Sequence, residues 1–253
     1  MTCVISTIQR FPIKGLSPER LDRTALQPGQ GVPGDRAYAF AVAGAPFDAA
    51  APRHLAKTNF LMLMRDEALA RLATRFDPAT QMLSIADEGA TLIDGCVAHA
   101  DDRARLENFF QEYLGLVDRP HLVQAEGHMF SDRAEKVISF QNLASIEEFE
   151  QRVGADVAPV RFRANIHLAG LEPWVEFGWI GRRIRVGGAT LQVIDPIRRC
   201  AATTVNPATA ERDLNIPKLL MEHYGHMNMG IYVRVLEGGE IAAGNAVEVG
   251  APA

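Results

Sequence analysis

Short stretches with the alternating pattern of β-strands are spread along the whole chain, and regularly spaced helices do not separate them. Apolar residues alternate on both sides of Gly187 and Gly188 within residues 182–199, which predicts a hairpin, and residues 81–95 show a second hairpin pattern. Because strands and helices do not alternate, the sequence favours a mainly β fold with attached helices (α+β), an antiparallel barrel or sandwich rather than a doubly wound sheet. Helical spacing or capping signals occur in four segments, residues 60–76, 101–115, 145–154 and 215–225.

Composition narrows the class of protein further. The chain has 253 residues, of which 47% are hydrophobic, so it can bury a core without disulfides. Its three cysteines, Cys3, Cys96 and Cys200, do not have the spacing of a disulfide framework, a zinc site or an iron–sulfur cluster. A net charge of −5 with no long basic run argues against nucleic-acid binding. The sequence shows no signal or transit pattern and no apolar run of membrane-spanning length, so we expect a cytoplasmic protein without membrane contact.

Cys200 has an unusually polar setting, DPIRRCAATTVNP, at the end of a predicted strand. In an extended backbone, Arg198 and Cys200 share one face and Arg199 points to the other. A cation beside a thiol favours the thiolate, which is both a nucleophile and a metal ligand. The alternative is a buried structural cysteine, which most lone cysteines are. Pro196 and the polar residues after Cys200 predict that the strand ends here, at the kind of rim where functional sites collect.

A second polar pattern lies in RFRANIHL, residues 161–168. If this segment is extended, Arg161, Arg163, Asn165 and His167 fall on one face, and apolar residues fall on the other. The polar face is either solvated, as arginines usually are, or it forms an array of planar donors suited to a phosphate or another oxyanion.

Other candidate residues stand in loops. Lys14 ends the segment FPIKG, and Arg36 follows two glycines in GVPGDR, where backbone amides can approach a ligand closely. His128 and Asp132, in EGHMFSD, are candidates for proton transfer, as is His226, although loop polarity explains them equally well.

The elements FPIKG, GDRAYAF, FRANI, PWVEFGW, RRCAATTVNP and YGHMNMGIYVRV occur in this order, and together they resemble the MOSC family. These are proteins related to the C-terminal domain of molybdenum cofactor sulfurase, and the chain is similar to bacterial relatives of the mitochondrial amidoxime reducing component. The resemblance covers nearly the whole chain. It implies a MOSC-type β-barrel formed by residues 1–42 and 126–253, with residues 43–125 as a small inserted α/β region.

The resemblance also implies a cofactor and the residues that bind it. The cofactor is the molybdenum cofactor (molybdopterin), a pterin dithiolene with a phosphate tail, and Cys200 would supply a soft thiolate to the metal. Arg163 and Asn165 would hold the phosphate and the pterin. Ser145, expected as the N-cap of the helix over residues 145–154, would help to cradle the phosphate with free backbone amides. The remaining cofactor-binding residues expected from the resemblance are Lys14, Gly15, Arg36 and Arg198.

Two residues depart from the family pattern. Gly15 stands where many relatives carry Ser or Cys, which removes a hydroxyl contact. Arg198 stands where a small polar residue is often found, which changes the size and charge of the cavity over the metal.

The resemblance predicts an oxidoreductase that reduces N-hydroxylated or related N–O or S–O compounds at a Cys200-ligated molybdenum, with His128 and Asp132 in catalytic roles. Its substrate would be a small molecule. The chain lacks a four-cysteine ferredoxin segment, so a separate ferredoxin or reductase would supply the electrons. One alternative is a non-catalytic carrier of the cofactor or of sulfur that uses Cys200. The other is a barrel without a cofactor, in which Cys200 is structural.

Overall fold

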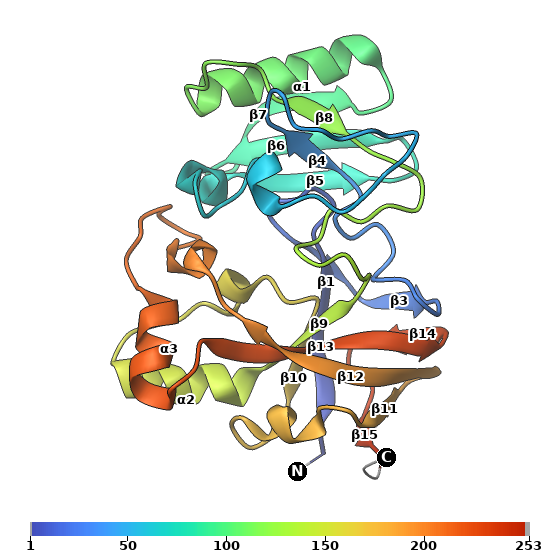
Figure 1. Ribbon diagram of the computed structural model, residues 1–253, viewed down its shortest axis with the longest axis vertical. Helices are drawn as coiled ribbons and strands as arrows, with labels where there is room; N and C mark the ends of the chain where they lie inside the picture. The colour runs from blue at the N-terminus through green and yellow to red at the C-terminus, as the bar shows by residue number, and fades with distance from the viewer. Residues whose placement is uncertain (1, 251–253) are drawn as a thin grey trace.

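The chain folds into two regions, which a computed structural model describes for residues 2–250. Figure 1 shows a strand-rich sheet region below and a smaller region above it, with the N- and C-termini at the bottom. We call residues 2–38 and 124–250 the sheet region and residues 39–123 the small region. None of the helices between residues 2 and 250 is long and apolar enough to cross a membrane.

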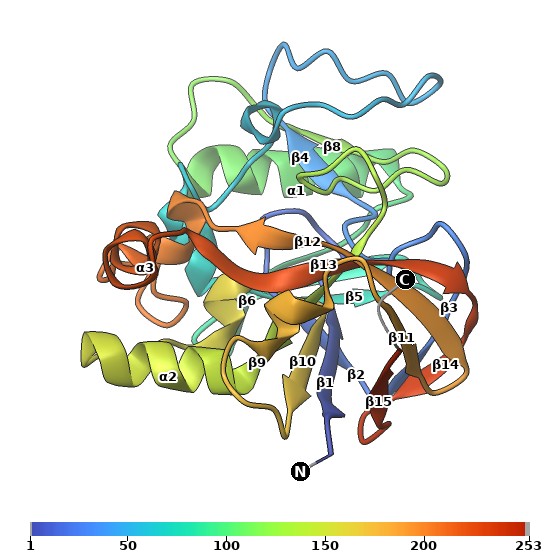
Figure 2. The same cartoon turned by 60° about the horizontal axis from the view of Figure 1, so that its bottom comes forward.

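The sheet region is built on one eight-stranded sheet that curls into a half-barrel, as Figure 2 shows from below. All neighbouring strands run antiparallel except β9 and β10, which are parallel and are connected through helix α2 (Leu143–Val153). In sheet order the strands are β15 (Val247–Val249), β11 (Arg183–Val186), β12 (Ala189–Arg198), β13 (Asn228–Glu237), β9 (Ile138–Asn142), β10 (Ile166–Ala169), β1 (Val4–Arg10) and β2 (Glu19–Leu21). A separate pair is formed by β3 (Arg23–Leu26) and β14 (Gly239–Ala242). This mainly β architecture with attached helices confirms the predicted fold class.

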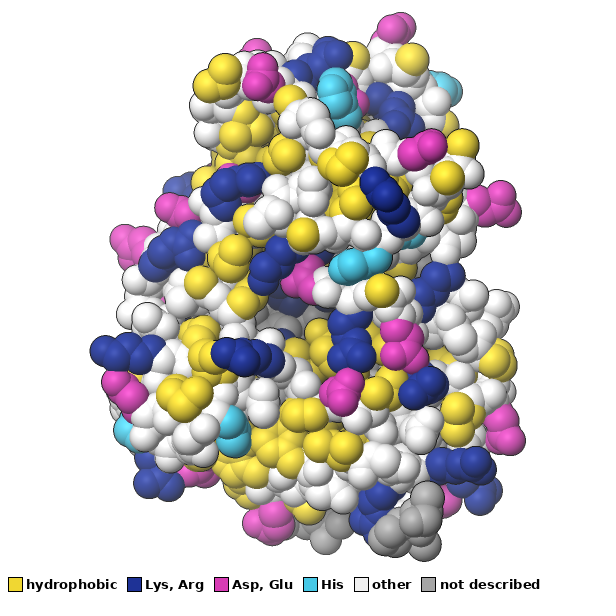
Figure 3. Space-filling model, viewed as in Figure 1, with side chains coloured by type: hydrophobic (Ala, Val, Ile, Leu, Met, Phe, Trp, Pro, Cys, Tyr) yellow, Lys and Arg dark blue, Asp and Glu magenta, His cyan; other side chains and the backbone are white. Residues whose placement is uncertain are grey.

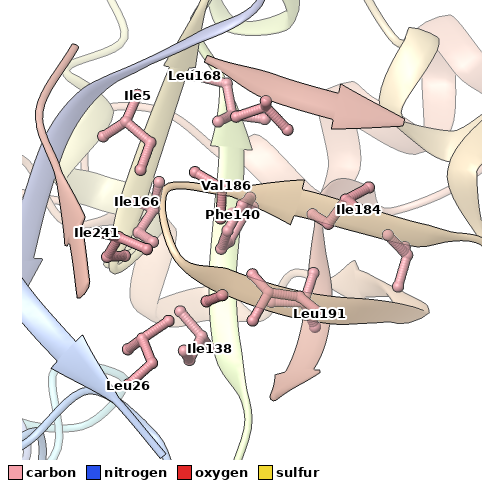
Figure 4. Packing of buried hydrophobic residues seen from close by; sticks show 14 of the residues in the cluster. Ile5, Leu26, Ile138, Phe140, Ile166, Leu168, Ile184, Val186, Leu191 and Ile241 are labelled. Atoms are coloured by element: carbon pink, nitrogen blue, oxygen red, sulfur yellow. The ribbon is translucent and has the colours of Figure 1, made fainter. Parts of the chain in front are cut away.

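The core of the sheet region follows from the alternation in the sequence. In the hairpin of β11 and β12, Ile184 lies opposite Leu191, and both side chains are fully buried. Figure 4 shows these residues packed with apolar side chains from β1, β9 and β10, among them Ile5 and Phe140. Burial of this apolar face is the main force that holds the curled sheet. The predicted hairpin is confirmed.

The small region has its own apolar core. It contains a three-stranded sheet, a two-stranded ladder and one long helix, whose Phe110 packs on Phe40 with ring centroids 4.3 Å apart. Ile13, Leu16 and Tyr38 of the preceding segment also pack into this core. The elements are β4 (Ala39–Ala41), β5 (Ala73–Asp77), β6 (Met82–Asp87), β7 (Ala90–Cys96), α1 (Ala100–Tyr113) and β8 (His121–Val123). Pairing of β4 with β8 places residues 39–41 with this core rather than with the barrel. The division of the chain into domains stays a prediction.

Two local predictions for these elements are wrong. Residues 60–76 do not form a helix. A short 3-10 turn (η2, Glu67–Arg71) is followed by β5, because residues 73–77 pair with β6 and this pairing overrides the helical spacing of Leu69 and Leu72. Ser145 does not cap α2, since the side chain of Asn142 accepts the hydrogen bond from the Ala144 amide at 3.1 Å.

Two other predicted helices are present, and several short 3-10 helices lie in the connecting segments. Helix α3 (Ile216–Tyr224) is capped by Asn215 and ends at Gly225 in a left-handed conformation, as such a sequence requires. Helix α1 confirms the prediction for residues 101–115. The remaining turns of helix are η1 (Lys57–Asn59), η3 (Pro159–Phe162), η4 (Val175–Trp179) and η5 (Ala201–Thr204).

Candidate functional site

A cavity of about 150 Å³ lies between the two regions. Figure 3 shows a hollow at this level of the molecule, with Lys and Arg side chains around it. Most of the residues singled out in the sequence line the cavity, although they come from five separate parts of the chain. They are Lys14, Gly15, Arg36, Asp132, Arg163, Asn165, Arg198 and Cys200.

Cys200 stands where β12 ends and the turn η5 begins. Its backbone is extended, and its carbonyl accepts hydrogen bonds from the amide and hydroxyl of Thr203 at 3.0 and 2.9 Å. The thiol is half-buried and faces the cavity, whereas Cys3 and Cys96 are buried elsewhere. The predicted strand end is therefore present, and it leaves one accessible thiol on the cavity wall.

The two arginines before Cys200 have different surroundings. Arg198 is exposed at the cavity rim. Arg199 is buried, and its guanidinium donates to the carbonyls of Met229 and Phe162, each at 2.8 Å, and to the side-chain carbonyl of Gln141 at 3.2 Å. Arg199 thus ties β12 to β13 and β9, and its donors are used within the fold.

A cation that the sequence reasoning missed lies beside Cys200. Lys57, from η1 in the small region, lines the cavity and interacts with the Cys200 thiol and the Asp132 carboxylate. Burial alone would lower the pKa of Lys57, but these two partners raise it above its ordinary value. No motif surrounds Lys57, and only the packing of one region on the other brings it to the thiol.

Arg163 reaches the cavity by a route that the strand pattern did not predict. The strand starts only at Ile166. Residues 159–162 form a 3-10 turn, and Arg163 has a left-handed backbone with φ of 50°. The period-two argument for residues 161–168 is therefore wrong, although Arg161, Arg163 and Asn165 all line the cavity.

The guanidinium of Arg163 has a buried donor that is not satisfied within residues 2–250. The guanidinium lies over the Phe11 ring, 4.2 Å from the centroid, and that donor is its Nη2 atom. Burial, together with the nearby charge of Arg36, lowers the pKa of Arg163 to about 9. A half-buried cation with a buried free donor and a second cation beside it favours the binding of an anion.

Asn165 is a fully buried link in the cavity wall. Its Oδ1 accepts hydrogen bonds from the amide and the hydroxyl of Ser139 at 3.2 and 2.8 Å, and its Nδ2 donates to the Gln9 carbonyl at 3.3 Å. The side chain thereby joins the start of β10 to β9 and β1. Its position beside Arg163 depends on this network.

Lys14 and Asp132 form an ion pair at the cavity. The Lys14 Nζ atom donates to Asp132 Oδ1 at 2.5 Å and to the Phe130 carbonyl at 3.0 Å. Burial lowers the pKa of Lys14, and the Asp132 charge partly opposes this effect. Burial would raise the pKa of Asp132, but Lys14 and Lys57 hold it below its ordinary value. Asp132 is thus a carboxylate at neutral pH.

Arg36 completes the cationic wall. Its guanidinium donates to the buried carboxylate of Asp35 and, at 3.1 Å, to the carbonyl of Arg163. Asp35 in turn accepts a hydrogen bond from the Phe11 amide at 2.7 Å, so Arg36 is held from both sides. Gly15, with φ of 86°, allows the chain after Lys14 to turn close to the Leu61 carbonyl.

Three predicted residues lie outside the cavity wall. His128 packs edge-on against Phe130, and burial lowers its pKa. His226 lies in an aromatic cluster, where its Nδ1 accepts a hydrogen bond from the Asn228 amide at 3.2 Å. Ser145 is fully buried at the first turn of α2, away from the cavity.

The environment of Ser145 explains why it does not take part. Its hydroxyl donates to the carboxylate of Glu176 at 3.0 Å and accepts from the Trp174 amide at 2.8 Å. Asn142 Nδ2 donates to the same carboxylate at 2.9 Å. The acceptor at this helix end is therefore a carboxyl side chain of the protein itself, and burial raises the pKa of that carboxyl group.

Within the part of the chain that the structure describes, no group of three or more His, Cys, Asp or Glu side chains is arranged to hold a metal ion.

The comparisons with known proteins include one family model, two curated relatives and two solved structures. The family model of the MOSC domain matches residues 124–248. The molybdenum cofactor sulfurase of Caenorhabditis briggsae is 32% identical over 113 residues, 42% of this chain and 16% of the relative. The protein of the same name from Caenorhabditis elegans is 26% identical over 157 residues, 60% of this chain and 22% of the relative. The chain thus spans less than a quarter of either curated relative.

Two solved structures are also similar. The YuaD protein of Bacillus subtilis aligns with a TM-score of 0.44 and 14% identity, over 98% of this chain and 96% of that chain. YiiM from Geobacillus stearothermophilus aligns with a TM-score of 0.36 and 24% identity, over 45% of this chain and 54% of that chain.

Proposed function

Residues 124–248 of this chain form a MOSC domain, and from this premise we propose that the cavity between the two regions binds molybdenum cofactor. We further propose that the protein is an oxidoreductase that reduces N-hydroxylated or related N–O or S–O compounds. One observation carries the proposal: the accessible thiol of Cys200 shares a cavity with the partly unpaired guanidinium of Arg163.

The residues of the cavity fit such a group. A pterin dithiolene with a phosphate tail brings its own sulfur ligands to molybdenum and needs one soft ligand and a grip on the phosphate from the protein. Cys200 would provide the soft ligand. Arg163, Arg36 and Lys14 would provide cations in the same cavity, and Arg163 has a donor without a partner among residues 2–250. When bound, the cofactor supplies two-electron redox chemistry, and a separate ferredoxin or reductase supplies the electrons.

The other residues of the cavity position the reactants and set its charge. Lys57 carries an ammonium group on the small-region side, because its pKa lies above its ordinary value, and this charge favours the thiolate of Cys200. Asp132 stays a carboxylate, because its pKa lies below its ordinary value, and it orients Lys14. Asn165 holds its wall through the bonds to Ser139 and Gln9 and thereby positions Arg163.

A second candidate function is the transfer of the cofactor or of sulfur, with Cys200 as the carrier. The names of the curated relatives favour it, since both are called molybdenum cofactor sulfurase, and their similarity extends over part of this chain.

Metal and pterin analysis tests the proposal on protein purified from a host that makes the cofactor. We expect molybdenum and pterin in a one-to-one ratio with the wild-type chain, and at least a tenfold loss of molybdenum in Cys200→Ser. Cys96→Ser, a cysteine buried in the small region, is the matched control and keeps its molybdenum. A Cys200→Ser protein with full molybdenum would falsify the assignment of the ligand.

Turnover separates the two candidate functions. The loaded wild-type protein is mixed with an amidoxime and a chemically reduced electron donor, and formation of the amidine is measured. Turnover by wild type but not by Cys200→Ser supports the oxidoreductase. A loaded protein that does not turn over, yet passes molybdenum or sulfur to an acceptor, supports the carrier.

A further inference from the structure

The side chain of Arg212 lies between the two regions and bonds to both of them. It belongs to the loop that follows the turn η5, and its backbone forms a β-bridge with Val205. The Nη1 atom of Arg212 faces the sheet region, where it donates to the Ala201 carbonyl at 3.4 Å and to the Thr204 hydroxyl at 3.1 Å. Because Ala201 directly follows Cys200, these two bonds hold the turn that carries the thiol.

The other terminal nitrogen of the same guanidinium faces the small region. Nη2 of Arg212 donates to the carbonyls of Leu63 and Met64 at 3.4 and 3.0 Å. It also donates to Oε2 of Glu67 at 2.8 Å. Leu63 and Met64 line the cavity, so Arg212 contacts the small-region wall as well as the turn of Cys200.

The two-sided arrangement matters more here than the ion pair. The side chains of Arg212 and Glu67 are 36% and 46% exposed, and an exposed ion pair contributes little on its own. A planar guanidinium can hold two surfaces at a fixed separation through its two terminal nitrogens, which the single ammonium group of a lysine cannot do. Arg71 provides a contrast, because it bonds to Asp87 and Glu88, which both belong to the small region.

The segment that Arg212 contacts is continuous with the turn η1, which carries Lys57. Within this segment, Nη2 of Arg65 donates to the Phe60 carbonyl at 3.3 Å, and the Phe60 amide donates to the Lys57 carbonyl at 3.1 Å. These bonds join the stretch from Lys57 to Arg65 into one unit. A contact that holds the end of this unit therefore also holds Lys57 beside Cys200.

We propose that Arg212 is a positioning residue, which fixes the small region against the turn of Cys200 and thereby sets the separation between the Cys200 thiol and Lys57. It acts through the two walls that it joins. The consequence for turnover rests on the proposed function, whereas the separation itself is measurable in the cofactor-free protein.

Cross-linking of the cofactor-free protein measures this separation. The reagent joins a maleimide, for the accessible Cys200 thiol, to a succinimidyl ester, for an amine, through the shortest available spacer. Mass spectrometry of the peptides quantifies the cross-link to Lys57. We expect its yield to fall about threefold or more in Arg212→Met, because the effective concentration of the amine drops when the walls are no longer joined. A folded Arg212→Met protein with the wild-type yield would overturn the proposal.

Two further variants separate the bridge from charge and from the loss of an exposed arginine. Arg71→Met removes an arginine of similar exposure whose partners lie in one region, and it is expected to keep the wild-type yield. Arg212→Lys keeps a charge near Glu67 but cannot bond both regions, so its yield is expected to fall as in Arg212→Met. A wild-type yield in Arg212→Lys, or an equal loss in Arg71→Met, contradicts the bridging role.

Hydrogen exchange gives a second measurement of the same bridge. The Arg65 amide donates to the Met62 carbonyl and the Thr203 amide to the Cys200 carbonyl, each at 3.0 Å. Loss of Arg212 is expected to speed the exchange of both amides, one in each region, about threefold or more. If Arg212→Met does not fold, Glu67→Ala removes a partner of the same guanidinium and is expected to have the same effect in smaller degree. Faster exchange in one region only contradicts a bridge between the two.

This inference and the proposed function can fail separately. A protein that never carries molybdenum, but whose cross-link to Lys57 depends on Arg212, contradicts the proposed function and supports the inference. A protein that carries molybdenum, but whose cross-link does not depend on Arg212, contradicts only the inference.

Discussion

The first turn of α2 and the cavity between the two regions both attract an anion, but only one of them receives it from the chain. At α2, the carboxylate of Glu176 is 1% exposed and accepts hydrogen bonds from Ser145 and Asn142. In the cavity, Nη2 of Arg163 is a buried donor without a partner among residues 2–250. The comparison shows that the residue types alone do not identify a ligand-binding site. A binding site is identified by the hydrogen-bond donors that have no partner within the folded chain.

The same contrast separates two arginines that line the cavity, the buried Arg199 and the half-buried Arg163. Arg199 donates hydrogen bonds to the carbonyls of Met229 and Phe162 and to the side chain of Gln141. Arg163 lies over the Phe11 ring, and its buried Nη2 has no partner among the described residues. One guanidinium is part of the framework, and the other is available to a ligand. The predictions below test this distinction, from the largest expected effect to the smallest.

Replacement of the satisfied arginine is expected to have the largest effect. Arg199→Met leaves three buried acceptors without a donor, so the free energy of unfolding falls by about 4 kcal/mol. The matched change Arg163→Met alters it by no more than about 0.5 kcal/mol, because no hydrogen bond of that guanidinium is lost. Urea unfolding of the cofactor-free proteins measures both. Equal losses would show that the two arginines do not differ in this way.

The second-largest effect is expected from a buried histidine that lies neither at the start of α2 nor in the cavity wall. His167, on β10, has a buried Nε2 without a partner in the described chain, and burial lowers its pKa to about 4. The folded protein keeps the ring neutral, while the unfolded chain takes up a proton below the ordinary value of 6.5. The free energy of unfolding therefore loses about 3 kcal/mol as the pH falls from 6.5 to 4, and it gains nothing from this group above 6.5.

His167→Gln removes that part of the pH dependence, and unfolding curves between pH 4 and 7 reveal it. His54→Gln, at an exposed position, leaves the wild-type profile unchanged. This unpartnered nitrogen belongs to a neutral ring, so it needs no ion. A His167→Gln variant that still loses stability over the same range would place the titration elsewhere.

The smallest effect on the free energy of unfolding is expected at the first turn of α2, where Ser145 contacts Glu176. Ser145→Ala removes the hydrogen bonds to Glu176 and from the Trp174 amide, which lowers the free energy of unfolding by about 1–2 kcal/mol. Its molybdenum content stays that of wild type, because α2 begins away from the cavity. Ser84→Ala on β6 serves as control and changes the stability by less than about 0.5 kcal/mol. Loss of molybdenum in Ser145→Ala would return this residue to the cofactor site.

Local sequence patterns account for much of the fold. The hairpin of β11 and β12 was predictable because its paired residues are at most nine positions apart along the chain, as Arg183 opposite Gln192 shows. The helix predicted over residues 60–76 is wrong at residues 73–76, because their pairing with β6 does not show in the periodicity of the segment. A helical spacing of three apolar residues does not outweigh the hydrogen bonds of a sheet.

The candidate site was predictable as a set of residues and not as a geometry. Arg163 and Asn165 reach the cavity although the strand begins only at Ile166, because Ser139 on β9 fixes Asn165 and the left-handed turn directs Arg163. Lys57 could not be found from the sequence, because no pattern near it indicates that η1 meets Cys200. The contacts of Arg212 depend in the same way on how the two regions pack.

The place of β1 in the sheet constrains the order in which the protein is assembled during synthesis. Strand β1 pairs on one edge with β2, which follows it directly, and on the other edge with β10. Gln9 donates to the Ala164 carbonyl across 155 residues, so this edge stays open until most of the chain has left the ribosome. Such late pairing slows folding and leaves the apolar Ile5 and Ile8 in need of protection until then. A fragment limited to residues 124–248 would lack this strand. Its strand β10 would then be an unpaired edge that can pair with another chain and promote aggregation.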